Sequence, residues 1–151
     1  MRKRKYTLKE QRLLNDYLYE KYRNYPQWKR VRVGPVVKKE EEKLYKVLRR
    51  WVDAIVFTGK KIILIEVKWS PKPEGVGELL LYRSLFPLTP EFQMYKDYPI
   101  ECEFVTTRYD RAIEDLCKKN NIKFIVYTPE WVKVLWAEEF GKPSTVRRAG
   151  K

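Results

Sequence analysis

The pattern of apolar and polar positions divides this chain into four predicted helices and five predicted strands. Thr7 begins a helix that runs to about Tyr22, whose apolar residues recur at helical spacing and form a stripe of Leu13, Leu14, Tyr17 and Leu18. Apolar runs rich in β-branched residues predict strands over residues 28–37, 51–58, 61–68, 100–106 and 122–127. Further helices are expected over residues 75–83, 110–119 and from 130 to the glycine at 141.

The order of these elements predicts one α/β domain. A strand, a helix and a strand follow one another from residue 100 to 127, an order that is typical of a right-handed parallel crossover. Residues 51–68 read instead as an antiparallel hairpin, so the sheet of about five strands is mixed and is flanked by helices. The domain spans residues 1–151, with a basic arm at residues 1–6, a charged stretch at Lys38 to Lys43, and a basic tail at residues 141–151.

Charged residues interrupt the predicted hairpin at Asp53, Glu66 and Lys68. Glycine is first in the two-residue loop Gly59-Lys60, which suits a type II′ turn. With that turn, or with a four-residue loop, Asp53 falls opposite Glu66. An odd-length loop or a bulge would shift this register.

Two carboxylates opposed across a hairpin repel each other, because their Cβ atoms lie about 5 Å apart. A hard divalent cation such as Mg²⁺ neutralises such a pair and keeps room for water and phosphate. Lys68 shares the face of Glu66, where it could activate water or stabilise charge on a phosphate. The alternative is a solvated face on which Lys68 pairs the acids, although Trp51, Ile55, Phe57, Ile62 and Leu64 on that face favour burial.

Asp53 followed by Glu66-Val67-Lys68 resembles the pattern of the PD-(D/E)xK nuclease superfamily, as does the leucine-rich helix over residues 75–83. Val52 stands where the superfamily name has proline. The resemblance implies a restriction-endonuclease-like core and a Mg²⁺- or Mn²⁺-dependent nuclease. It also implies that Asp53, Glu66 and the carbonyl of Val67 bind the metal, while Lys68 orients or deprotonates water.

Two helices supply further candidates through the same resemblance. Many members contribute a glutamate from the first helix, and Glu20 is the candidate here, either as a metal ligand or as a solvated charge. Glu10 competes, but its position three residues after Thr7 is explained by a capping box. Some members carry Gln and Tyr four residues apart on the later helix. Glu78 and Tyr82 have this spacing, so Tyr82 is expected to support the site or to contact the scissile strand.

Composition points to a polyanionic partner. Lys and Arg number 33 against 20 acidic residues, a formal charge of +13, and phosphate contacts dominate nonspecific nucleic-acid affinity. DNA is the expected partner, with RNA not excluded, and the candidate phosphate contacts are Lys29, Arg30, Arg32, Lys72 and Arg83. The rival reading is a basic DNA-binding module that keeps the nuclease fold without catalysis.

Absent residue types narrow the chemistry further. The sequence has no histidine and only two cysteines, which argues against a zinc site, a four-cysteine iron–sulfur cluster and a histidine general base. No apolar run is long enough to span a membrane, so an intracellular, cytoplasmic protein is expected. The charged fraction of 35% hints at a thermophile. The resemblance extends to small nucleases of archaeal viruses and to junction resolvases, which suggests a virus-encoded protein and a homodimer.

Overall fold

A single five-stranded mixed sheet organises the chain. The computed structural model describes residues 7–36 and 49–141. The strand order is β1-β2-β3-β4-β5, in which β1 to β3 are antiparallel and β3 to β5 are parallel. Their bounds are β1 Gln27–Val33, β2 Arg50–Phe57, β3 Ile62–Lys68, β4 Ile100–Thr106 and β5 Ile122–Val126. The predicted α/β class and mixed sheet are confirmed.

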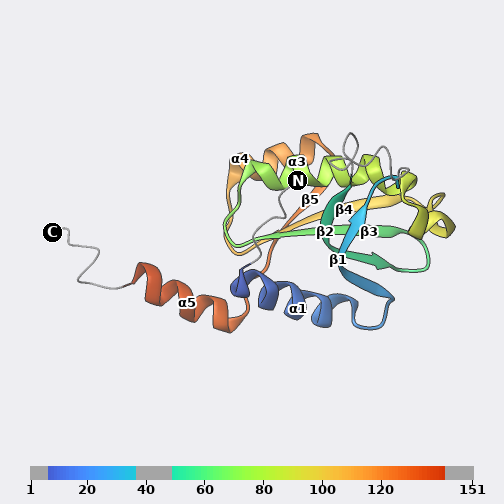
Figure 1. Ribbon diagram of the computed structural model, residues 1–151. Helices are drawn as coiled ribbons and strands as arrows, with labels where there is room; N and C mark the ends of the chain where they lie inside the picture. Colours follow the sequence, from blue (N-terminus) through green and yellow to red (C-terminus); the bar gives the residue numbers. More distant parts are fainter. Residues whose placement is uncertain (1–6, 37–48, 142–151) are drawn as a thin grey trace.

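Helices cover both faces of this sheet (Figure 1). Helix α1 packs on one face, and α3 and α4 pack on the other, while α5 continues beyond the sheet. Their bounds are α1 Leu8–Tyr22, α3 Pro73–Leu85, α4 Arg111–Lys119 and α5 Glu130–Phe140, with short 3-10 turns η3 Phe86–Leu88 and η4 Pro90–Tyr95. Within the described ranges, every helix is too short or too polar to traverse a lipid bilayer. The predicted arm at 1–6, the charged stretch at 38–43 and tail residues 142–151 lie outside those ranges.

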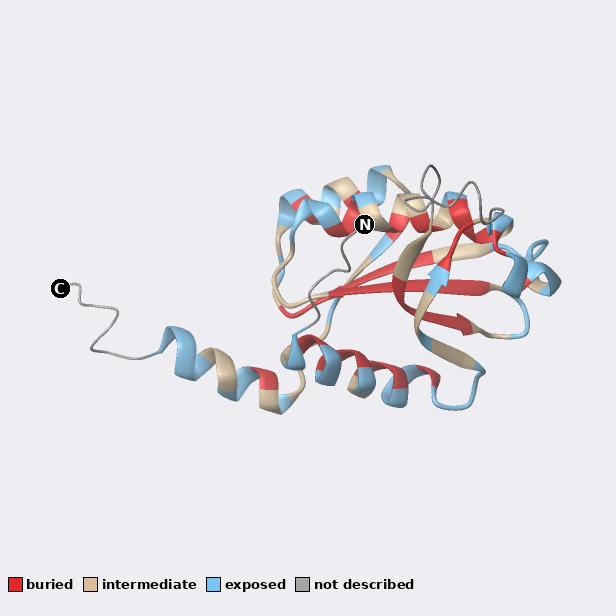
Figure 2. Ribbon diagram, viewed as in Figure 1, coloured by how far each residue is buried: buried red, intermediate tan, exposed pale blue. Residues whose placement is uncertain are grey.

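Strand β3 lies at the centre of the sheet, so both of its faces are covered (Figure 2). Its alternate residues divide between two apolar clusters, with Ile62 and Leu64 toward α3 and Ile63, Ile65 and Val67 toward α1. Six of its seven residues are buried. A polar side chain near the end of this strand therefore enters a largely apolar environment, where only a charged partner or a hydrogen bond can compensate the lost hydration.

The hairpin register is the one that the turn predicts. Phe57 pairs with Ile62, and the antiparallel ladder continues to Ala54 opposite Ile65. Gly59 has φ +90, as a turn glycine requires. The next pair of positions along the two strands belongs to Asp53 and Glu66, so the two acids come at the end of the ladder.

Close packing of α3 on the sheet determines where that helix begins. Pro73 occupies the first turn of α3, where its missing amide hydrogen costs nothing. A Cβ added at Gly75 would lie 2.7 Å from the Phe104 ring of β4, so only glycine permits this approach. The contact brings the first turns of α3 over the end of β3, and hence Glu78 over Lys68.

Candidate active site

Asp53 and Glu66 form the buried centre of the site, with both residues at 0% exposure. The Oδ2 atom of Asp53 accepts a hydrogen bond of 2.8 Å from the backbone amide of Val67. A side-chain oxygen of β2 thus binds the amide that follows Glu66 on β3. This bond holds the Asp53 carboxylate against the catalytic candidates of the neighbouring strand.

Lys68 lies between two carboxylates. Its Nζ atom is 3.6 Å from Oε2 of Glu66 and 3.0 Å from Oε1 of Glu78 on α3. The lysine side chain is 12% exposed, so the ammonium group is largely shielded from water. Charge-assisted contacts of this kind orient a lysine that would otherwise sample many rotamers. Glu78 therefore serves as the partner of Lys68, a role that its helical spacing from Tyr82 did not reveal.

Arg30 approaches the other carboxylate from the edge strand β1. Its Nη1 atom is 3.5 Å from Oδ1 of Asp53, and its guanidinium lies 5.6 Å from the centre of the Trp51 ring. The Arg30 backbone has φ +55, a left-handed conformation that costs a non-glycine residue about 1–2 kcal/mol. Such local strain clusters at functional sites, where surrounding contacts maintain it. Arg30 was expected to contact phosphate and is placed beside a candidate metal ligand instead.

Glu10 is the first-helix acid that reaches this region. Its residue is 8% exposed, and its Oε2 atom accepts a hydrogen bond of 2.9 Å from the amide of Trp69, directly after Lys68. Glu10 and Lys68 also line the same cavity of about 380 Å³, together with Ser70 and Lys72. The backbone amide of Glu10 donates a hydrogen bond to the Thr7 hydroxyl, as a capping box predicts. The Glu10 carboxylate, by contrast, accepts the bond from the Trp69 amide.

Glu20 lies elsewhere, which corrects the expectation that it joins the metal shell. Ten residues separate it from Glu10, or about 15 Å along the helix axis. Glu20 is exposed and accepts a 3.4 Å hydrogen bond from the Tyr127 hydroxyl. The overlooked signal is that Glu10 precedes Leu13 and Leu14 by three and four residues, so it extends the buried stripe.

Tyr82 and Arg83 were expected to contact nucleic acid, but both make contacts within the fold. Tyr82 is 3% exposed within the apolar cluster under α3, so contact with a scissile strand is not available to its ring. Arg83 donates hydrogen bonds to the carbonyl oxygens of Asn120 and Asn121, at 3.0 and 3.2 Å. These bonds join α3 to the loop between α4 and β5. They occupy both terminal nitrogens of the Arg83 guanidinium group.

The remaining basic candidates lie at the surface. Lys72 is exposed at the N-cap of α3 and lines the cavity that contains Lys68. Arg32 is exposed, with its guanidinium 5.1 Å from the Trp51 ring centre. Lys29 is exposed and donates to Asn15 of α1 at 3.0 Å. Of these three residues, Lys72 is the one that shares a cavity with Lys68.

The charge balance of this region suits a divalent cation. The three carboxylates Asp53, Glu66 and Glu78 and the two cations that contact them, Lys68 and Arg30, give a formal charge of −1. Across residues 7–36 and 49–141, no group of three or more acidic, cysteine or histidine side chains is arranged to hold a metal ion. A metal at Asp53 and Glu66 would therefore depend on two carboxylates plus water or phosphate, which is the way Mg²⁺ is usually bound.

A second buried glutamate, Glu103 of β4, has different surroundings on the opposite face of the sheet. It is 1% exposed and accepts hydrogen bonds from the hydroxyls of Tyr17 and Tyr22 on α1, at 2.7 and 2.6 Å. Burial, together with the neighbouring Glu103 charge, raises the pKa of both phenols well above the usual range. Both tyrosines therefore remain neutral hydrogen-bond donors, and this cluster joins α1 to the sheet.

Comparisons with solved structures agree on the fold. A repair endonuclease from Pyrococcus abyssi superposes with a TM-score of 0.50 and 12% identity over 84% of this chain and 49% of that chain. EndoMS in a double-stranded DNA complex gives 0.50 and 11%, over 84% and 48% of the two chains. AF1548, a protein of unknown function, gives 0.51 and 16%, over 96% and 73%.

These likenesses show a restriction-endonuclease-like core. The chain spans about half the length of the two endonuclease structures. No protein-family model and no curated protein matches the sequence.

Proposed function

We propose that the protein is a metal-dependent nuclease of the PD-(D/E)xK type, which hydrolyses phosphodiester bonds in DNA as an endonuclease. One observation carries this proposal: Asp53, Glu66 and Lys68 meet where the β2–β3 ladder ends, and both acids are fully buried. Two buried carboxylates at this position destabilise the folded state, and such a cost is usually retained because the residues have a function. Binding a cation beside a lysine is such a function.

Asp53 and Glu66, with the carbonyl of Val67, would hold Mg²⁺ or Mn²⁺, which supplies charge stabilisation and a more acidic water. The Val67 amide orients Asp53 through its 2.8 Å hydrogen bond. Glu78 holds the Lys68 ammonium at 3.0 Å, so the lysine can orient a water molecule or stabilise the negative charge that develops on the phosphate. Each group is positioned before substrate arrives, which reduces the reorganisation required for reaction.

We assign Glu10 the supporting role that the sequence resemblance led us to expect of Glu20. Its carboxylate is bound to the Trp69 amide and shares a cavity with Lys68 and Lys72. That cavity of about 380 Å³ combines lysines with an acid and can admit a phosphate and its attacking water. Arg30 neutralises Asp53 from the other side and could turn toward phosphate when a cation binds.

DNA is the proposed substrate because of charge and fold. The formal charge of +13 favours a polyanion, and the EndoMS structure of the same fold contains double-stranded DNA. We also propose a homodimer, the assembly expected of the junction-resolvase subclass, because a junction resolvase cuts two strands and needs two sites. Analytical ultracentrifugation should give twice the chain mass of 18.4 kDa, whereas a monomer at high concentration would argue against this assembly.

The decisive experiment is a cleavage assay. Supercoiled plasmid, linear duplex, single strand and a four-way junction are incubated with Mg²⁺, Mn²⁺ or EDTA. Wild-type protein should cut at least one of them in a metal-dependent way, and Glu66→Gln should not. Glu103→Gln is the matched control, since it changes a second buried glutamate outside the site. Absence of cutting on every DNA, and on RNA, would overturn the proposal.

A noncatalytic DNA-binding module is the second candidate. It is favoured by the internal neutralisation of the acids, since Arg30 contacts Asp53 and Lys68 contacts Glu66 and Glu78. This alternative predicts binding that weakens steeply with salt, has no metal requirement and is unchanged by Glu66→Gln. DNA binding without cleavage of any substrate would support the noncatalytic module.

A further inference from the structure

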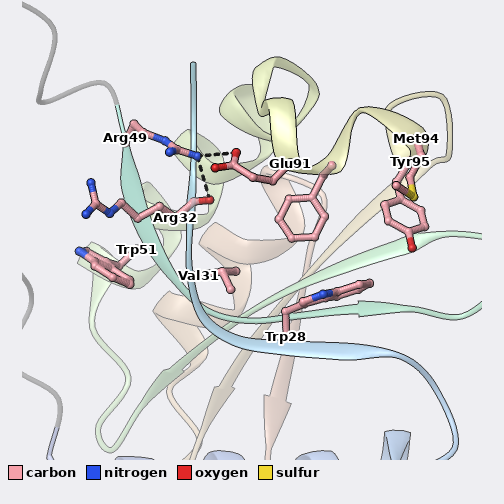
Figure 3. A pocket seen from close by; sticks show the side chains of 9 residues that line it. Trp28, Val31, Arg32, Arg49, Trp51, Glu91, Met94 and Tyr95 are labelled. Carbon is pink, nitrogen blue, oxygen red and sulfur yellow. Dashed lines mark hydrogen bonds and ion pairs between the residues drawn. The ribbon is translucent and has the colours of Figure 1, made fainter. Parts of the chain in front are cut away.

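A separate pocket opens beside the candidate active site, between β1, the start of β2 and η4 (Figure 3). Its volume is about 620 Å³. Aromatic side chains, a methionine and two arginines contribute most of its lining: Trp28, Trp51, Tyr95, Met94, Arg32 and Arg49. Neither the proposed metal chemistry nor the phosphate cavity at Lys68 uses this pocket.

Aromatic packing gives the pocket a rigid wall. The Trp28 ring makes edge contacts with Phe92 and Tyr95, with ring centres 5.2 and 5.7 Å apart. Figure 3 shows Trp51 and Arg32 on one side of the pocket and Tyr95 and Met94 on the other. Met94, which also lines the pocket, is 75% exposed. Aromatic and apolar side chains thus line both sides of the pocket, with Arg32 over the Trp51 ring.

Charged groups complete the lining. Arg49 contacts the Glu91 carboxylate at 2.8 Å, and this hydrogen bond holds the pKa of Glu91 below its usual value. Glu91 therefore presents ionised acceptor oxygens to any N–H donor that enters. Arg32 is exposed and lies 5.1 Å over the Trp51 ring, where it can meet a phosphate at the rim. Aromatic faces with an acceptor and a cation match a nucleotide better than they match a purely apolar ligand.

The pocket is connected to the catalytic candidates through β2. Trp51 precedes Asp53 by two residues, a separation of about 7 Å along a strand. The Arg30 guanidinium also bridges them, at 3.5 Å from the Asp53 carboxylate and 5.6 Å from the Trp51 ring centre. A strand with a phosphate at Asp53 would therefore bring a nearby nucleotide to the pocket entrance.

We propose that this pocket binds an unpaired nucleobase of the DNA strand that is cut. This inference rests on the proposed nuclease function, to which it adds a substrate class: DNA with a single-stranded, bulged or mismatched nucleotide near the cleavage position. A paired base keeps its faces within the duplex stack, whereas an unpaired base can place its face on an aromatic side chain. Phosphate binding alone needs only lysines and arginines and does not call for aromatic side chains around an accessible pocket.

The test measures binding without cleavage. The Glu66→Gln protein is titrated in EDTA with dye-labelled single strands of equal length, one with all its bases and one with a central run of abasic sites. Loss of base stacking should weaken binding of the abasic strand by about 5-fold or more. Adding Trp51→Ala should reduce this difference to less than about 2-fold, because the stacking surface is lost.

Tyr19→Ala is the matched control. Like Trp51, Tyr19 is an aromatic residue with an arginine over its ring, Arg23 at 5.1 Å from the ring centre, but it is 69% exposed and lies on α1 outside the pocket. This substitution should leave the difference between the two strands intact. Equal affinity for both strands, or equal effects of Trp51→Ala and Tyr19→Ala, would overturn the proposal.

A second readout covers the case in which Trp51→Ala fails to fold. Strands carrying 2-aminopurine at one position are added to the Glu66→Gln protein, and their fluorescence should fall when the base stacks on the pocket aromatics. Met94→Ala should weaken the quenching. Because the Met94 side chain is highly exposed, we expect this substitution to leave the fold intact. Quenching that is absent, or unchanged by Met94→Ala, would count against the pocket.

The nuclease and pocket proposals fail in different ways. Metal-dependent cleavage with equal binding of normal and abasic strands would retain the nuclease and reject the base pocket. Base-dependent binding without cleavage by the wild-type protein would retain the pocket and reject the nuclease.

Discussion

Two buried glutamates on neighbouring strands illustrate how similar burial can serve different ends. Glu66 of β3 and Glu103 of β4 are 0% and 1% exposed. Glu103 faces α1 and accepts hydrogen bonds from two neutral tyrosine hydroxyls. Glu66 lies toward α3, at the end of the β2–β3 ladder beside Asp53 and 3.6 Å from Lys68. One acid is surrounded by donors that suit its charge, and the other belongs to a cluster with excess negative charge.

Burial alone therefore does not identify a functional carboxylate. A buried charge costs free energy, which local hydrogen bonds recover at Glu103. At Glu66 a second carboxylate adds repulsion, so the arrangement favours capture of a cation. The neighbours of each acid, rather than its exposure, separate the structural role of Glu103 from the catalytic role that we propose for Glu66.

The largest expected effect is on cleavage. Glu66→Gln should lower the initial rate of metal-dependent cleavage by about 10³-fold, the scale of losing a main electrostatic contribution to the transition state. Glu103→Gln should change this rate by less than about 2-fold once the protein is folded, because that residue lies on the other face. Rates are measured on the preferred DNA at saturating Mg²⁺. Comparable losses in both variants would erase the distinction between the two acids.

The next largest effect concerns the two candidate acids of α1. Glu10→Gln should reduce cleavage by about 10-fold or more, as supporting residues of metal sites commonly do. Glu20→Gln should leave the rate within about 2-fold of wild type, since Glu20 is exposed and bonded to Tyr127. Kinetic assays of both variants at several Mg²⁺ concentrations test this assignment. A greater loss in Glu20→Gln would restore the expectation drawn from sequence.

Stability should respond in the opposite order. Glu103→Gln weakens two charge-assisted hydrogen bonds and should lower the free energy of unfolding by about 1–3 kcal/mol. Glu66→Gln removes repulsion between buried acids and should raise that free energy by about 1 kcal/mol in EDTA. Urea denaturation at pH 7 followed by circular dichroism measures both. Destabilisation by Glu66→Gln would indicate that its charge is structural.

Alkaline pH should reveal how much the tyrosine cluster contributes to the free energy of unfolding. The pKa values of Tyr17 and Tyr22 are raised in the folded protein, so these phenols keep their protons while unfolded phenols lose theirs near pH 10. Their stabilisation is complete below pH 10 and falls above it, by up to about 1.4 kcal/mol per pH unit for each group. Urea titrations from pH 7 to 11 should show a smaller fall in Tyr17→Phe.

Tyr19→Phe is the control for this fall, because Tyr19 is 69% exposed. It should retain the wild-type pH dependence. The thiols of Cys102 and Cys117 also contribute above pH 9, since burial raises the pKa of each to about 11. They are present in every variant, so the difference between Tyr17→Phe and Tyr19→Phe isolates the phenol. Parallel curves for both variants would contradict the role of the cluster.

The smallest expected effects distinguish Lys72, the N-cap of α3, from Arg83 near the end of that helix. Lys72→Ala should weaken DNA binding a few-fold and lower the slope of log affinity against log salt by about 1, because one phosphate contact is lost. Arg83→Ala should leave this slope unchanged and lower the free energy of unfolding by about 0.5–1 kcal/mol, since its partners are two loop carbonyls. Fluorescence anisotropy in EDTA provides the slopes. A reduced slope in Arg83→Ala would mean that its guanidinium is redirected to DNA.

The sequence alone determined the fold class and the centre of the candidate site. Alternation with period two assigns Asp53, Glu66 and Lys68 to strands, and the short turn at Gly59 specifies which positions face each other. These are local constraints, because a hairpin register depends on a few adjacent residues. The parallel crossover through α4 follows in the same way from the order of elements and its preferred hand.

The distant residues that join that centre depend on how the whole chain packs. Glu10 rather than Glu20 reaches β3 because of where α1 crosses the sheet, which helical periodicity cannot specify. Arg30 meets Asp53 through β1–β2 pairing across 23 residues. The pocket beside Trp28 and Trp51 needs η4 to pack against β1, some 60 residues away in the chain. Side-chain neighbours of this kind depend on the summed packing of the whole domain, and no short stretch of sequence encodes them.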